Sequence, residues 1–246
     1  MKSKAKWFAG FIFLSFVMVA VGVLVGNLRL GKSDASQVSL TKENKEITVV
    51  IDAGHGGEDG GCVGADGTLE KDLNLSVALE VYDILRAAGI NAALTRGEDE
   101  MLYDMYGDLS DYGGKKKTYD LKNRVRYAAE SECLLFVSIH MNKFSDSRYS
   151  GLQVYYSPND SDSITAALRV QSYIKDYLQP KNEREIKKAG SNIYVLHRSQ
   201  MPAVLIECGF LSNPEERELL KDGDYRKKLS FCIAAAIADS LANFQT

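Results

Sequence analysis

The chain has 246 residues, of which 45% are hydrophobic and 26% charged, with 4 prolines, and this composition is typical of a folded protein rather than a disordered or collagen-like one. Its 30 Lys and Arg residues against 33 Asp and Glu residues give a net charge of −3. The first 32 residues hold five positive residues and no acidic one, which leaves 25 against 33, a net charge of −8, for the remainder. Since nucleic-acid binding calls for a basic face, we expect no nucleic-acid partner.

The N-terminal region predicts a membrane segment. Residues 7–28 carry no charge for 22 residues and follow three lysines. As a helix this run would be about 33 Å long, which is enough to cross a bilayer core. We therefore expect residues 1–6 in the cytoplasm, an anchor at 7–28, a polar linker at 29–45 and one domain at 46–246, outside the cytoplasmic membrane. A signal peptide cleaved after the small residues near Ala20 and Gly22 is the alternative and would give a secreted protein.

Apolar runs and helical spacing alternate along residues 46–246. The β-branched run at 47–53 predicts a buried strand that leads into a glycine-rich loop. Apolar residues at helical spacing then run from Leu73 to Ala88, where Gly89 ends the helix. In chain order, we expect further strands at 90–96, 134–140, 151–157, 191–197 and 203–210, and further helices at 121–130, 164–178 and 225–244.

This alternation predicts the fold class. Strands that alternate with helices, several of them apolar throughout, indicate an α/β domain with a mainly parallel twisted sheet covered by helices on both faces. Residues 97–120 are rich in Asp, Gly, Tyr and Lys without clear periodicity. This stretch predicts a mobile surface loop beside a site, or a variable insertion without a role.

Two of the three histidines follow predicted strands at the edge where parallel sheets bind ligands. His55 lies in DAGHGG and His140 in VSIHMN. Glu70 begins the helix after the His55 loop, close enough to fold back toward that edge. Each could instead be structural, the histidines as hydrogen-bonded polar residues and Glu70 as a partner of the helix N-terminus. His197 ends a different run and is expected to be structural.

A second carboxylate lies inside the apolar run AVLIECGF, at Glu207. A carboxylate in a buried strand is unfavourable unless it is paired or bound to a metal, although an edge-strand position would expose it. Two histidines and one carboxylate would leave zinc an open position for water, and a second carboxylate could take that water's proton. The glycine-rich loop matches neither G-x-G-x-x-G nor a P-loop, which argues against a nucleotide site.

Several motifs in order resemble one enzyme family over residues 47–244. They are VVIDAGHGGEDGG, GTLEKDLNL, the TR pair at 95–96, LKNRVRYAAE, FVSIHMN, GLQVYY and MPAVLIECGFLSNPEE. The sequence is similar in these motifs to the zinc-dependent N-acetylmuramoyl-L-alanine amidases of bacterial cell walls. The resemblance implies that His55, Glu70 and His140 bind Zn²⁺ and that Glu207 is the catalytic carboxylate.

The implied substrate is the amide between the lactyl group of N-acetylmuramic acid and L-alanine of the peptidoglycan stem peptide. A short catalytic domain behind an apolar segment is further similar to the germination-specific amidases of spore-formers. The alternatives are another zinc peptidase or deacetylase of the cell wall, or a non-catalytic wall-binding protein. Peptidoglycan and the cytoplasmic membrane are thus the expected partners, and the sequence names no protein partner.

Overall fold

A computed structural model describes residues 48–107 and 111–244. The strands of this part form one sheet in the order β2-β1-β3-β6-β4-β5. Their bounds are Val49–Ala53 (β1), Ala92–Leu94 (β2), Leu135–Asn142 (β3), Gln153–Tyr156 (β4), Lys187–Lys188 (β5) and Ala203–Phe210 (β6). Neighbours from β2 to β6 run parallel, whereas β4 pairs antiparallel with β6 and parallel with β5. The α/β class is confirmed. The sheet is mixed, because β4 is antiparallel to its neighbour β6 while the other neighbours are parallel.

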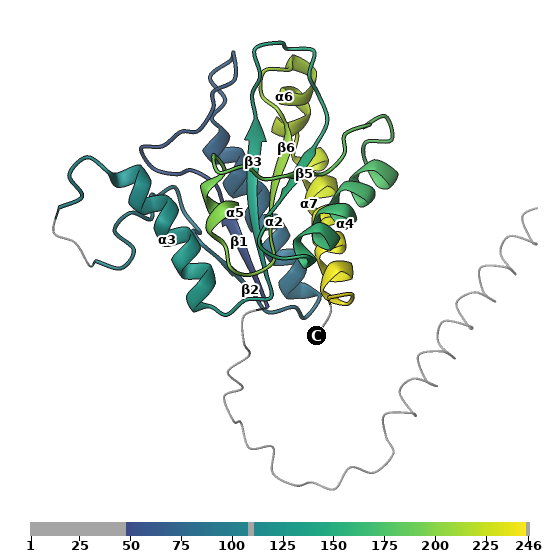
Figure 1. Ribbon diagram of the computed structural model, residues 1–246. Helices are drawn as coiled ribbons and strands as arrows, with labels where there is room; N and C mark the ends of the chain where they lie inside the picture. The colour runs from purple at the N-terminus through teal and green to yellow at the C-terminus, as the bar shows by residue number, and fades with distance from the viewer. Residues whose placement is uncertain (1–47, 108–110, 245–246) are drawn as a thin grey trace, which may run out of the picture. The chain divides into compact units, whose positions relative to one another are not determined.

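Helices cover both faces of the sheet (Figure 1). Their bounds are Glu70–Ala87 (α2), Lys116–Glu130 (α3), Asp162–Tyr177 (α4), Tyr194–Arg198 (α5), Pro214–Lys221 (α6) and Gly223–Leu241 (α7). Helices α2, α4 and α7 pack in one apolar cluster with alternate strand residues such as Ile51 and Ile206. Helices α3 and α5 pack on the opposite face, against the strand residues that alternate with those of the first cluster, such as Val50 and Leu205. Both faces of the central strands are therefore buried, which explains their continuous apolar runs.

The strand predicted at 191–197 is wrong. Tyr194–Arg198 forms the short helix α5, while the residues before it are irregular. The side chain of Asn159 donates to the backbone oxygens of His197 and Ser199 and so fixes the end of this turn from a distant loop. The apolar composition of the run reflects packing against the sheet, which the sequence pattern does not distinguish from strand pairing.

Helix α6 and strand β5 were not predicted. Helix α6 follows the N-cap Asn213, whose side chain accepts hydrogen bonds from the backbone of Glu215 and Glu216, with Pro214 in the first turn. This is a common pattern at helix starts, so SNPEE carried the signal. Strand β5 has only two exposed residues, Lys187 and Lys188, and no apolar pattern marks it.

The predicted location at the cell membrane is contradicted within the described residues. None of their helices combines the length and apolar character needed to cross a bilayer. The longest, α7 and α2, have 19 and 18 residues, but each carries charged side chains along its length, such as Asp224 and Lys227 in α7 and Glu80 in α2. They are helices of a folded domain. The segment 7–28, on which the membrane prediction rested, lies outside the described residues, as does the whole of the linker predicted at 29–45.

Candidate functional site

The glycine-rich loop after β1 presents His55 at the carboxyl edge of the sheet. The backbone of His55 lies in the left-handed region, with a φ of 62°. A Cβ on Gly54 would lie 2.2 Å from Nε2 of His140, so only glycine lets the two histidines approach each other. Their rings meet edge to face with centroids 5.0 Å apart. Gly54 therefore allows the close approach of the two imidazoles.

Three of the four predicted site residues converge on one point. His55 and His140 place a ring nitrogen next to the same oxygen, Oε1 of Glu70, with His55 Nε2 at 3.3 Å and His140 Nδ1 at 2.9 Å. One ligand atom from each residue lies within 4.8 Å of the other two. Two imidazole nitrogens and a carboxylate oxygen form a donor set that suits zinc.

Glu70 begins helix α2 and folds back toward the sheet. Its Oε2 accepts a hydrogen bond of 2.7 Å from the backbone of Cys62, and its Oε1 one of 3.2 Å from the backbone of Met141. Burial raises the pKa of Glu70, but hydrogen bonds and charges from His140 and His55 outweigh it and hold the pKa well below its usual value. Glu70 is therefore an anion held in one orientation, as a metal ligand requires.

Glu207 lies beside His140 across the sheet, because the two residues are register partners on β6 and β3. Its Oε2 is buried and has no hydrogen-bond partner among the described residues. Burial raises the pKa of Glu207 to about 7, with the charge of Glu70 acting in the same direction. A carboxyl group with such a pKa can both take and release a proton near neutral pH.

Two arginines hold the histidine loop, and sequence reasoning assigned them no role. Arg124 donates from Nη2 to the backbone oxygen of His55 at 2.7 Å and from Nη1 to that of Ala53 at 2.8 Å. Arg96 donates to the backbone oxygens of Ala53 at 2.8 Å and Gly54 at 3.1 Å. The signal was present, since both lie in motifs shared with the amidases, but side chain to backbone contacts are not visible in a sequence.

Arg124 is itself held in a buried ionic cluster. It contacts Asp52 at 2.7 Å and Asp120 at 2.8 Å, and no more than 4% of any of the three side chains is exposed. Burial alone would raise the pKa of Asp52, but Arg124 and hydrogen bonds from Ser138 and Thr95 lower it below its ordinary value. The cluster ties α3 to β1 directly beneath the His55 loop.

We expect Arg124→Met to lower the free energy of unfolding by about 3–5 kcal/mol, because it leaves two buried carboxylates without their partner. Urea denaturation followed by circular dichroism measures this. Arg126→Met is the matched control on the same helix. Arg126 forms an exposed pair with Glu130 at 2.8 Å and stacks on the ring of Tyr106 at 3.6 Å, so its loss should lower the unfolding free energy by no more than about 1–2 kcal/mol. Equal effects of the two substitutions would contradict a structural role of the buried cluster.

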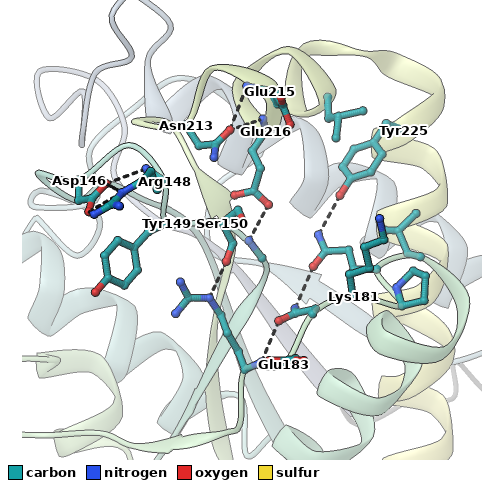
Figure 2. A pocket seen from close by; sticks show the side chains of 17 residues that line it. Asp146, Arg148, Tyr149, Ser150, Lys181, Glu183, Asn213, Glu215, Glu216 and Tyr225 are labelled. Atoms are coloured by element: carbon teal, nitrogen blue, oxygen red, sulfur yellow. Dashed lines mark hydrogen bonds and ion pairs between the residues drawn. The ribbon is translucent and has the colours of Figure 1, made fainter.

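Three of the four predicted site residues, all but Glu70, line a cavity of about 200 Å³ between α3 and α5. Its lining includes His55, His140 and Glu207 from the sheet edge, Lys117 from α3 and Tyr194 from α5. A larger cavity of about 940 Å³ lies elsewhere, beside the loops that follow β3 and α4 (Figure 2). Figure 2 shows Tyr149, Glu216 and Tyr225 around it, and none of the four predicted site residues lines it. The smaller cavity therefore brings together three of the four predicted site residues.

Comparison with known proteins places the chain in a family. A family model described as N-acetylmuramoyl-L-alanine amidase matches residues 49–239. The germination-specific N-acetylmuramoyl-L-alanine amidase of Bacillus subtilis (strain 168) is 34% identical over 247 residues, which cover 96% of this chain and 95% of the relative.

Two solved structures show the same fold. The CwlD amidase from Clostridioides difficile, solved in complex with the GerS lipoprotein, is 37% identical, with a TM-score of 0.73 over 79% of this chain and 98% of the other. The amidase AmiC2 of Nostoc punctiforme is 32% identical, with a TM-score of 0.67 over 80% of this chain and 98% of the other. From its motifs, fold and relatives, this chain belongs to the N-acetylmuramoyl-L-alanine amidase family.

Proposed function

We propose that this amidase is zinc-dependent and that His55, Glu70 and His140 hold the ion. The donor set supports this, because two neutral imidazoles and one carboxylate leave zinc a position for the reacting groups. His55 would offer Nε2 and His140 Nδ1, the nitrogens that already lie next to Glu70. Zinc bound there supplies a Lewis acid that polarises the scissile carbonyl group.

One observation carries the catalytic assignment. The buried Glu207 oxygen has no hydrogen-bond partner among the described residues, yet it lies in the same cavity as the two histidines. An unpartnered buried polar atom is unfavourable, so its retention at this position calls for a functional partner. Water and the scissile amide are the partners that hydrolysis would bring into the cavity.

Glu207 then moves the proton. As a carboxylate it accepts a proton from the attacking water, and as a carboxylic acid it donates that proton to the leaving nitrogen of L-alanine. Burial, which raises the pKa of Glu207 to about 7, supports both steps because the group is neither strongly acidic nor permanently protonated. Arg124 and Arg96 keep the His55 backbone in place during this cycle through the contacts given above.

The identity of the cleaved bond separates this activity from its rivals. We expect digestion of purified peptidoglycan to release stem peptides with a free L-alanine amino group and to leave glycan strands with intact N-acetyl groups. Mass spectrometry of the products measures this directly. A cut within the peptide would indicate a peptidase, loss of acetyl groups a deacetylase, and unchanged polymer a wall-binding protein.

We further propose that the chain acts on spore peptidoglycan during germination. The relative that supports this is the germination-specific amidase of B. subtilis, which aligns along nearly the whole chain. The C. difficile relative was solved with a lipoprotein, which supports the proposal that this chain also has a protein partner. Spores from a deletion strain should keep stem peptides on all muramic acid residues of the cortex, and normal removal of these peptides would contradict the role.

A further inference from the structure

The two ring nitrogens of His55 face different carboxylates. Nδ1 lies 2.8 Å from Oδ2 of Asp59, while Nε2 lies 3.3 Å from Oε1 of Glu70. Because a carboxylate only accepts hydrogen bonds, a neutral His55 that donates to Asp59 carries its proton on Nδ1. The lone pair of Nε2 is then directed toward Glu70 and the metal site.

Asp59 is fixed by its own loop. Its backbone N–H and C=O both pair with Gly56 at 3.0 Å, which closes a narrow loop directly after His55. Its Oδ1 accepts a hydrogen bond of 3.3 Å from the backbone of Gly61. Only 16% of the Asp59 side chain is exposed. The carboxylate is thus placed independently of the histidine that it contacts.

Residues 97–120, predicted as a loop, contact the loop that carries His55 and Asp59. Lys117, in the first turn of α3, places Nζ 3.0 Å from Oδ2 of Asp59. Asp99 accepts a hydrogen bond of 2.8 Å from the backbone of Gly57 and pairs with Lys71 at 2.7 Å. The stretch is therefore attached to the histidine loop at several points, through Gly57, Glu58 and the Asp59 carboxylate itself.

We propose that Asp59 is a positioning residue that holds the His55 ring with Nε2 toward the metal, and that Lys117 braces Asp59 from helix α3. This inference rests on the zinc site proposed above. It assigns to part of the 97–120 stretch a role in metal affinity. Carboxylate partners of metal-binding histidines act in this way by fixing the orientation and protonation of the ring, and their loss lowers metal affinity by about 10–100-fold.

The test measures the zinc dissociation constant of the full chain by competition with a chromogenic chelator. Asp59→Ala should weaken zinc binding by about 10–100-fold. Asp59→Asn keeps a hydrogen-bond acceptor without the charge, so it should restore part of this loss. Glu58→Gln is the charge-matched control, because Glu58 is 75% exposed and pairs with Lys116 at 3.0 Å. It removes one negative charge from the same loop and should bind zinc as the parent does.

Lys117→Met should weaken zinc binding by no more than about fivefold, since its ion pair with Asp59 is largely exposed on the lysine side. The same substitution in the Asp59→Asn background should add nothing if Lys117 acts through the Asp59 charge. Lys116→Met is the control on the adjacent residue. Long-range ¹⁵N spectra of the zinc-loaded parent should show the His55 proton on Nδ1, a signature that a merely structural role of Asp59 does not require.

The outcomes separate this inference from the proposal beneath it. If the parent chain binds no zinc, the zinc site itself is refuted. If the parent binds zinc but Asp59→Ala binds it equally well, or Glu58→Gln weakens it as much, only the role of Asp59 fails. The role of Lys117 would be refuted if Lys117→Met bound zinc more tightly than the parent. It would also be refuted if the substitution weakened zinc binding equally in the parent and in Asp59→Asn.

Discussion

Glu207→Gln should retain zinc and lose turnover by about 10²–10⁴-fold, the range typical of general acid and base catalysis. The amide keeps the shape of the side chain but cannot accept a proton from water. Since Glu207 lies beside His140 rather than among the three converging side chains, metal binding should be unaffected. Elemental analysis measures the zinc content, and release of stem peptide from peptidoglycan measures the turnover.

Glu215→Gln is the matched control for this substitution, because Glu215 is exposed on α6 and does not line the site cavity. It should hydrolyse peptidoglycan at the parent rate. Two results would remove the catalytic role from Glu207. One is a variant that cleaves within a few-fold of the parent, and the other is a variant that has lost its zinc.

His55→Ala and His140→Ala should each weaken zinc binding by more than about 100-fold. Removing a residue that binds the metal lowers affinity more than removing a residue that only hydrogen-bonds to a metal-binding side chain. Each variant leaves only two protein ligands. His197→Ala uses the third histidine of the chain as a control, since it is exposed on α5 and lies outside the converging cluster. Zinc titration of the three purified variants distinguishes them. Full zinc occupancy in either of the first two would exclude that histidine from the site.

Glu70→Gln separates the ligand carboxylate from the catalytic one. It exchanges an anionic donor for a neutral amide, so zinc affinity should fall and activity should partly return when excess zinc is supplied. Glu207→Gln should show no such recovery, because its metal is already in place. Assay of both variants across one zinc titration makes the comparison, and recovery of Glu207→Gln by zinc would reverse the two assignments.

Much of the fold was visible in the sequence because its central strands are buried on both sides. Runs such as 134–140 and 203–210 have no polar face, and they became β3 and β6 at the centre of the sheet. The run at 191–197 is also partly apolar, but Tyr194–Arg198 forms α5. Its apolar side chains pack against the sheet, and Asn159 donates a hydrogen bond to the backbone at its end. Only Val195 and Leu196 of the run at 191–197 are buried, and the apolar composition alone did not separate this short helix from a strand.

The sequence also indicated part of the site. His55 and His140 could be named because they follow strands, Glu207 because it interrupts an apolar run, and Glu70 because it begins the helix after the His55 loop. The structure brings His55, Glu70 and His140 together and places Glu207 in the same cavity as the two histidines, although their roles stay predictions. Arg124 and Asp59 could not be found in this way, since a charged residue in a polar segment looks like a solvent-exposed one until its burial is known.

The central claim is that one zinc ion binds between His55, Glu70 and His140 beside Glu207. Diffraction from zinc-soaked crystals of the domain, collected on both sides of the zinc absorption edge, tests it most directly. We expect a single anomalous peak about 2.0–2.2 Å from His55 Nε2, His140 Nδ1 and a Glu70 oxygen, with Glu207 outside the coordination sphere. A peak bound to Glu207 in place of Glu70, or zinc found only at other residues, would contradict it.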